Sequence, residues 1–307
     1  MSLVEKALKK MENARAASAA AATLPVRRTG DVAAPEVPRS PPAHSYAPAH
    51  ALPSETQARS DKLITINHTA LRNSGLLPTA ADERRIAAEF RQIKRPLVAA
   101  MRGRGVPPLP HGRAVMVASA LPGEGKTFTS INLSLSLILE RDTSVVLVDG
   151  DLAKAHLSRL FGVREEPGLT DLLVDESRDI GSVIIPTSAR GLSILPAGHG
   201  SQTATELLAS ARMEHVVTEL LARDPTRIVV FDSPPLLLTT ESRALTSVAG
   251  QVVVVVRAED TSHSAVVEAL QYVAEGRPVG LVLNQCRSRP THGYYSYGEY
   301  GESTDSN

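Results

Sequence analysis

Short apolar runs recur through the second part of the chain, and their lengths and spacing predict strands. The runs cover residues 114–118, 144–148, 192–195, 227–231, 251–256 and 279–283. Nearly continuous apolar runs of this length are typical of strands buried on both faces of a parallel sheet, because half-exposed strands alternate apolar and polar positions. We therefore expect each of these runs to form a buried strand.

Segments with helical periodicity lie between these runs, most clearly at residues 205–221 and 263–275. Alternating strands and helices predict helices on both faces of a mostly parallel sheet, joined by right-handed crossovers. The expected architecture is a three-layer α/β domain over residues 113–286.

A separate amphipathic helix precedes this domain. Its apolar positions recur at helical spacing, at Ile86, Phe90, Ile93 and Leu97. Pro96 is expected to end or kink the helix, because proline removes a backbone donor. The opposite face is basic, and we interpret it as either a solvated face or an interface; its members are Arg84, Arg85, Arg91, Lys94 and Arg95.

The remaining segments divide by composition. Residues 1–16 predict a short amphipathic helix, which is either a frayed terminal helix or a docking helix. Residues 17–60 are rich in Ala, Pro and Ser and predict a disordered linker, since they hold too little apolar surface to offset the entropy of ordering. Residues 61–112 are interpreted as a docking segment and the basic helix, and residues 287–307 as a disordered Gly-, Ser- and Tyr-rich tail.

Charge and apolar content limit the possible partners. The sequence has 33 basic and 33 acidic residues, so net charge gives no support for an obligatory nucleic-acid partner. The longest apolar runs are far shorter than the roughly 20 residues that span a bilayer, and no signal-peptide run opens the chain. We therefore expect a cytoplasmic protein, peripheral to the inner membrane through a partner.

The strongest chemical signal is the segment SALPGEGKTFTS, residues 119–130, which follows a predicted strand and opens a helix. Glycines 123 and 125 let successive backbone N–H groups point inward, where they and the helix N-terminus can hold phosphate oxygens. Lys126 adds a positive charge and Thr127 a hydroxyl ligand for Mg²⁺. This pattern predicts a P-loop NTPase fold, although Ala120 stands where the motif begins with Gly. The expected nucleotide contacts are Pro122, Gly123, Glu124, Gly125, Lys126, Thr127 and Phe128.

Acidic residues follow two of the predicted strands. VVLVDGDL places Asp149 and Asp151 at one strand end, and IVVFDSPP places Asp232 at another. Ligands of open α/β sheets lie beyond the carboxyl ends of the strands. A single Asp at such a place is often only a helix cap, but three of them beside a phosphate loop predict a metal–nucleotide site.

Together these motifs resemble the bacterial tyrosine kinases (BY-kinases), and the similarity covers about residues 62–290. The fragments EFRQIKRPL, SALPGEGKTFTSINL, LVDGDL, PGLTDLL, ILPAG, ATELLAS, FDSPPLL and GLVLNQ carry it. The resemblance implies that Lys126 and Thr127 bind ATP·Mg²⁺, and that Asp149 and Asp232, directly or through water, hold the metal with Thr127. It also implies that Asp151 is the candidate base toward a tyrosine hydroxyl. The catalytic set is then Lys126, Asp149, Asp151 and Asp232.

The opening MSLVEKAL most resembles the branch of this family that accompanies exosortase-linked exopolysaccharide genes. The resemblance implies a membrane polysaccharide co-polymerase as activator, fused or separate, and the lack of a membrane segment in the sequence leads us to expect a separate one. We also expect self-association through the kinase domain and the tail. Two departures weaken parts of it. Ala153 and Ala155 replace an Arg-rich turn, and the oligomerisation motif E-x-x-R-x-x-R aligns with Ala88, Arg91 and Lys94 and so lacks its glutamate.

Tyrosines gather at the end of the chain, where no apolar pattern could bury them. We predict that they are phosphoacceptors of an autokinase, and the alternative is a sticky disordered tail. These tyrosines are Tyr294, Tyr295, Tyr297 and Tyr300.

Two other functions fit the phosphate loop. One is a partitioning-type ATPase switch, although such proteins usually carry a second lysine where this chain has Leu121. The other is a nucleotide-binding scaffold without catalysis. We propose Asn284 and Arg257 as candidate adenine contacts, only because they lie at the ends of late strands.

Overall fold

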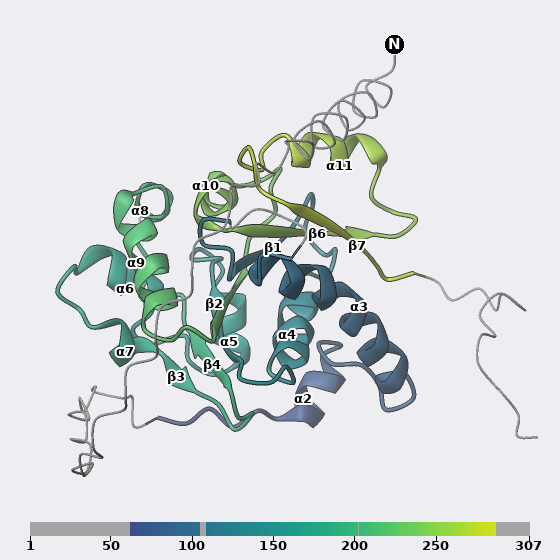
Figure 1. Ribbon diagram of the computed structural model, residues 1–307, viewed down its shortest axis with the longest axis horizontal. Helices are drawn as coiled ribbons and strands as arrows, with labels where there is room; N and C mark the ends of the chain where they lie inside the picture. The colour runs from purple at the N-terminus through teal and green to yellow at the C-terminus, as the bar shows by residue number, and fades with distance from the viewer. Residues whose placement is uncertain (1–61, 105–108, 202, 287–307) are drawn as a thin grey trace, which may run out of the picture. The chain divides into compact units, whose positions relative to one another are not determined.

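The computed structural model describes residues 62–104, 109–201 and 203–286. The predicted helix 1–16, the linker 17–60 and the tail 287–307 lie outside the described residues. The described part contains a seven-stranded sheet in the order β3-β4-β2-β5-β1-β6-β7, parallel except for the β3–β4 pair (Figure 1). The strands are β1 (Ala114–Ser119), β2 (Ser144–Asp149), β3 (Ile185–Pro186), β4 (Leu192–Leu195), β5 (Arg227–Asp232), β6 (Gln251–Arg257) and β7 (Val279–Asn284).

Helices pack on both faces of the sheet and enclose two apolar cores. One face carries α2 (His68–Asn73), α3 (Glu83–Met101), α4 (Lys126–Leu137) and α5 (His156–Leu160). The other carries α6 (Leu169–Val174), α7 (Ile180–Val183), α8 (Ala204–Leu208), α9 (Ala211–Ala222), α10 (Thr240–Val248) and α11 (His263–Leu270) (Figure 1). The predicted three-layer P-loop fold with a mostly parallel sheet is confirmed.

Each of the predicted strands is present, within one residue of its expected end. The short antiparallel strand β3 was not predicted, because two residues carry no detectable period. The predicted helix 205–221 is interrupted: α8 ends at Leu208, and Ser210 takes an extended conformation at the N-cap position of α9, with its hydroxyl donating to the carbonyl of Leu207 at 2.7 Å. A serine at that point is a recognisable N-cap signal.

Strand β7 differs from the expectation that every strand is buried on both faces. Leu281 is 59% exposed and Leu283 is 65% exposed, whereas strand β6 beside them is buried along most of its length. Among the described strands β7 lies at the edge of the sheet, and α11 packs its apolar residues against β6. The position of β7 in the sheet therefore overrides its apolar pattern.

The basic helix α3 also departs from its expected pattern. It continues past Pro96 to Met101, so Pro96 does not end it. Lys94 was assigned to the charged face, but it is only 6% exposed. Its ammonium group pairs with Glu140 at 2.9 Å and donates to the carbonyl of Ser136 at 2.7 Å. Lys94 thus joins α3 to α4 rather than serving an outer surface.

Residues 62–78 pack on the α/β domain. Ile64 forms a parallel bridge with Thr187, and its N–H donates to the carbonyl of Pro186 at 2.9 Å. Ile64, Leu71 and Leu77 are buried in the core that α3 and α4 also line. This packing brings the turn at residues 75–76 to the edge of the site described below.

The strand register brings the acidic strand ends together. Asp149 on β2 lies directly opposite Asp232 on β5, and Asp232 lies opposite Val117 on β1. Strand β1 leads into the loop 119–126 and helix α4. The three central strands therefore place both carboxylates and the phosphate loop together at the carboxyl ends of the strands.

The loop before α6 requires glycine at position 168 for packing rather than for backbone conformation. A Cβ atom there would lie 2.1 Å from the carbonyl oxygen of Pro196 and 2.5 Å from the nitrogen of Gly198. Both are main-chain atoms and cannot rotate away. We expect Gly168→Ala to lower the free energy of unfolding by about 3 kcal/mol or more, as in severe overpacking. Urea denaturation measures the effect.

The matched control is Gly280→Ala on β7, where an added Cβ would have no atom within 4 Å. This variant should be neutral or slightly stabilising, because alanine reduces the entropy of the unfolded chain. Equal denaturation midpoints for the two variants would contradict the packing argument.

No helix within residues 62–104, 109–201 and 203–286 is both long and apolar enough to cross a bilayer.

Candidate nucleotide site

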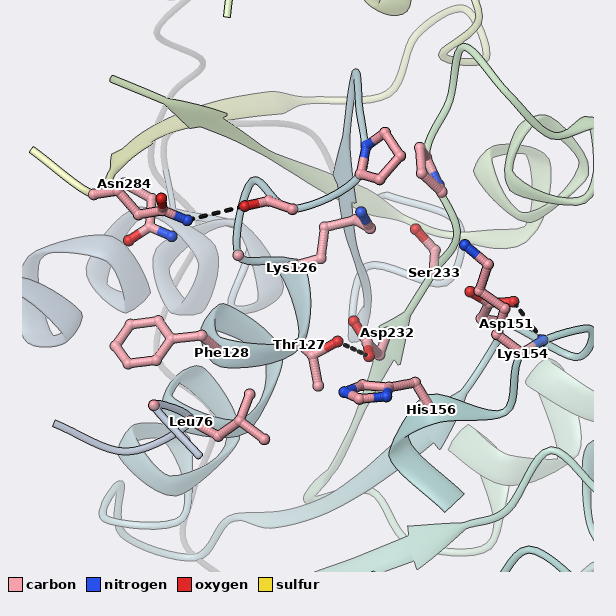
Figure 2. A pocket seen from close by; sticks show the side chains of 16 residues that line it. Leu76, Lys126, Thr127, Phe128, Asp151, Lys154, His156, Asp232, Ser233 and Asn284 are labelled. Carbon is pink, nitrogen blue, oxygen red and sulfur yellow. Dashed lines mark hydrogen bonds between the residues drawn. The ribbon is translucent and has the colours of Figure 1, made fainter. Parts of the chain in front are cut away.

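A cavity of about 560 Å³ lies at the carboxyl ends of the central strands (Figure 2). Its walls come from the phosphate loop, the ends of β5 and β7, the turn after β2 and the turn between α2 and α3. The lining residues are Gly75, Leu76, Pro122, Gly123, Gly125, Lys126, Thr127, Phe128, Asp151, Lys154, His156, Asp232, Ser233, Pro235, Asn284 and Gln285.

The phosphate loop depends on glycine at position 125. Gly125 has φ +97° and is the N-cap residue of α4. A Cβ atom there would lie 1.9 Å from Nδ2 of Asn284, so the loop is both left-handed and closely packed at this point. The positive end of the α4 dipole therefore faces the cavity, which favours an anion.

Lys126 opens helix α4 and reaches back along the cavity wall. Its ammonium group donates to Oγ of Ser119 at 2.8 Å. Burial lowers the pKa of Lys126, and the negative charges of Asp232, Glu124 and Asp151 oppose that shift. The lysine is thus held among carboxylates, with its charge available to a phosphate group.

Asp232 is a buried acidic group that lines the cavity. Thr127 Oγ1 donates to its Oδ2 at 2.7 Å (Figure 2). Ser130 Oγ donates to its Oδ1 at 3.0 Å. The pKa of Asp232 is raised to about 7, chiefly by burial and also by the nearby carboxylate of Asp149, while the hydrogen bonds from Thr127 and Ser130 and the charge of Lys126 act in the opposite direction. A cation placed here would favour the ionised form.

Asp149 is fully buried beside Asp232, and only one of its two carboxylate oxygens has a hydrogen-bond partner. Its Oδ2 accepts hydrogen bonds from the backbone N–H and the hydroxyl of Ser158, both at 2.7 Å. Its Oδ1 has no hydrogen-bond partner. Burial raises the pKa of Asp149, against these bonds from Ser158.

The donor set fits Mg²⁺. The unpaired Oδ1 of Asp149, the Asp232 carboxylate and the Thr127 hydroxyl are the hard oxygen donors that Mg²⁺ prefers. Within the described residues there is no cluster of three His, Cys, Asp or Glu side chains that could hold a metal. In Mg²⁺ sites of nucleotide enzymes, one or two carboxylates act together with phosphate oxygens and water.

Asp151 stands apart from this buried pair. It lines the cavity and is partly exposed, and its Oδ1 accepts a hydrogen bond from the backbone N–H of Lys154 at 3.0 Å (Figure 2). The turn after it also brings Lys154 and His156 to the cavity. An accessible carboxylate at the mouth can contact an incoming acceptor group.

Most of the residues that the sequence suggested line one cavity: Pro122, Gly123, Gly125, Lys126, Thr127, Phe128, Asp151 and Asp232. Asp149 and Glu124 do not line it, because both side chains are buried behind the wall. Arg257 points elsewhere and pairs with Asp260 at 3.1 Å. The four tail tyrosines lie outside the described residues.

Sequence reasoning missed several lining residues. Gly75 and Leu76 come from a turn far away in the sequence, and only the packing of residues 62–78 brings them here. Lys154 and His156 lie in the turn that departs from the family pattern. They could have been found as polar side chains close after a strand-end acid.

The end of β7 is tied to the phosphate loop. Asn284 Nδ2 donates to the carbonyl of Glu124 at 2.8 Å, and Gln285 Nε2 donates to that of Gly123 at 2.9 Å. The amide group of Asn284, which the sequence suggested as an adenine contact, therefore also holds the loop.

Comparison with known proteins agrees with this geometry. An AAA domain model matches residues 112–277, which is more than half of the chain. The tyrosine-protein kinase YwqD of Bacillus subtilis is 28% identical over 191 residues, covering 62% of this chain and 78% of YwqD. The tyrosine-protein kinase Wzc of Salmonella typhimurium is 29% identical over 192 residues, but the chain spans only 26% of Wzc.

Among solved structures, the kinase domain of VpsO superposes with a TM-score of 0.55 at 28% identity. The match covers 68% of this chain and all of that domain. Sequence and structure thus lead to the same group of proteins. The chain belongs to the AAA-domain family, and within that family its relatives are bacterial tyrosine-protein kinases.

Proposed function

We propose that this protein is an ATP-dependent tyrosine autokinase that phosphorylates its own C-terminal tyrosines and thereby regulates exopolysaccharide synthesis or export. The observation that carries the proposal is the unpaired, buried Oδ1 of Asp149 next to Asp232 and the phosphate loop. Such a pair is costly to bury unless a cation joins it, and Mg·ATP would bring one. The proposed reaction, phosphoryl transfer to tyrosine, follows the relatives YwqD and Wzc, which are tyrosine-protein kinases.

In this proposal the phosphate loop and Lys126 hold the β- and γ-phosphates, and Thr127, Asp149 and Asp232 hold Mg²⁺. The metal, when bound, neutralises the charge of the phosphate oxygens. Lys126 lines the cavity, with its ammonium group 2.8 Å from Ser119 Oγ, and would place a positive charge beside the phosphates. Pro122 and Phe128 complete the wall of the nucleotide site.

Asp151 is proposed as the base. It would take the proton from the tyrosine hydroxyl while that oxygen bonds to the γ-phosphorus and the bond to the bridging oxygen of ADP breaks. Its partial exposure at the cavity mouth suits a group that must meet an acceptor from outside.

The proposed activator is a membrane polysaccharide co-polymerase segment, which would also place the protein at the inner membrane. Self-association through the kinase domain and the tail would let one copy present its tyrosines to another. A tethered acceptor needs little specific recognition, because tethering gives an effective concentration of roughly millimolar.

The tail is tested by replacing Tyr294, Tyr295, Tyr297 and Tyr300 together with Phe. We expect phosphotyrosine, measured by mass spectrometry after incubation with Mg·ATP, to fall at least about tenfold, because the acceptor hydroxyls are gone. ATP affinity should not change. The matched control is Tyr272→Phe, whose ring lies 3.4 Å from the Arg243 guanidinium and keeps that contact in the variant.

Undiminished phosphotyrosine in the quadruple variant would contradict the tail as acceptor. ATP hydrolysis by the wild-type protein without any phosphotyrosine would instead favour the partitioning-type switch. ATP binding with neither reaction would favour the scaffold.

A further inference from the structure

Glu124 lies within the phosphate loop, yet its side chain turns away from the cavity. It is only 1% exposed, and it is not among the cavity-lining residues. A buried carboxylate beside a site for anionic phosphates would weaken phosphate binding unless it had another role. Its hydrogen bonds show what that role is.

The Glu124 carboxylate accepts three hydrogen bonds from two directions. The backbone N–H of Leu121 donates to Oε2 at 2.6 Å, which closes the loop on itself. The Thr261 hydroxyl donates to Oε1, and the backbone N–H of Arg257 lies 3.4 Å from the same oxygen. One side chain thus joins the phosphate loop to the end of β6 and to the connection between β6 and α11.

Glu124 makes these contacts away from the cavity in which the phosphates would bind. Asn284 and Gln285 hold the carbonyls of the same loop from β7. Backbone N–H groups can bind phosphate only if their directions are fixed before the ligand arrives, since disorder would otherwise have to be removed on binding. Glu124 is well placed to fix them, because its side chain links the loop to the β6–α11 connection.

We propose that Glu124 is a positioning residue that pre-shapes the phosphate loop by anchoring it to Thr261, and so sets the affinity for the nucleotide phosphates. The inference rests on the proposed nucleotide site but not on tyrosine as acceptor. It assigns Glu124 no contact with ATP through its side chain.

Glu124→Gln tests the anchor with almost no change in volume. An amide has one acceptor oxygen, so in either orientation its NH₂ group faces a backbone N–H, that of Leu121 or that of Arg257. A buried donor left unsatisfied costs about 1–3 kcal/mol, which corresponds to roughly 5- to 150-fold in an equilibrium constant. We expect Mg·ADP affinity, measured by calorimetry, to fall within that range.

Thr261→Val removes only the hydroxyl and should weaken Mg·ADP binding in the same direction but less, and Thr261→Ser should restore it. In the double variant the two effects should not add, because each change breaks the same joint. A second readout needs no ligand. Amide hydrogen exchange of residues 120–126 in the nucleotide-free protein should be faster in Glu124→Gln than in wild type.

The control is Asp224→Asn. Asp224 is also a connecting carboxylate, since it accepts a hydrogen bond from Ser144 Oγ at 2.7 Å, but it lies at the opposite ends of the strands. This variant should lose stability without losing Mg·ADP affinity. The inference is overturned if Glu124→Gln behaves in the same way, or if its affinity and loop exchange equal those of wild type. A wild-type protein that binds no nucleotide would refute the proposed function, whereas the exchange comparison would still decide the role of Glu124.

Discussion

Lys126→Met should reduce autophosphorylation at least about 100-fold, because removing one preorganised charge from a phosphoryl-transfer site typically has an effect of that size. The ammonium group is held at 2.8 Å from Ser119 Oγ, beside the helix N-terminus that the phosphates would occupy. Methionine keeps most of the length of the side chain but carries no charge. Phosphotyrosine formed per minute by purified protein, measured by mass spectrometry, gives the ratio directly.

The fold should survive this substitution, since burial already opposes the charge of Lys126 and lowers its pKa. Near-ultraviolet circular dichroism and the denaturation midpoint check that. Lys62→Met is the matched control, because Lys62 forms an exposed ion pair with Glu166 of the kind that contributes little. Wild-type phosphotyrosine levels in Lys126→Met, in a preparation free of other tyrosine kinases, would contradict the kinase proposal.

The three acidic residues should divide into two classes when each is changed to Asn. Asp149→Asn and Asp232→Asn should lower Mg·ATP affinity, because both carboxylates are proposed metal ligands. Asp151→Asn should keep that affinity within a few-fold but lose roughly 10²- to 10⁴-fold in the rate of phosphoryl transfer, as expected when a general base is removed. Calorimetry with Mg·ATP and single-turnover phosphotyrosine formation separate binding from chemistry.

A loss of fold stability in Asp232→Asn should not account for its lower Mg·ATP affinity. Burial raises the folded-state pKa of Asp232 to about 7, so above the unfolded pKa its ionised form destabilises the fold in the absence of a cation. Asparagine resembles the neutral acid, and the hydroxyls of Thr127 and Ser130 can rotate to accept from its NH₂ group. The nucleotide-free Asp232→Asn protein should thus be at least as stable as wild type at pH 8. An equal loss of Mg·ATP affinity in all three variants would argue against Asp151 as the base.

The apolar runs and the motif spacing were enough to predict the architecture of the described domain and most of the residues that line its cavity. An apolar run such as that of β5 is buried wherever helices cover both faces of the sheet. The glycines at 123 and 125 allow the positive φ angles of the loop whichever strands lie beside it. Asp151 and Asp232 could be placed at the site because carboxyl ends of parallel strands share one edge.

Only the tertiary structure decided how each side chain is used. The sequence does not reveal that α11 covers β6 and leaves Leu281 exposed, or that Lys94 faces Glu140 instead of water. Glu124 shows the same limit, because Thr261, its distant partner, is brought to it by the pairing of β1 with β6. Local periodicity records which positions are apolar and where a turn falls, but the partner of a buried polar group is set by contacts between segments far apart in the chain.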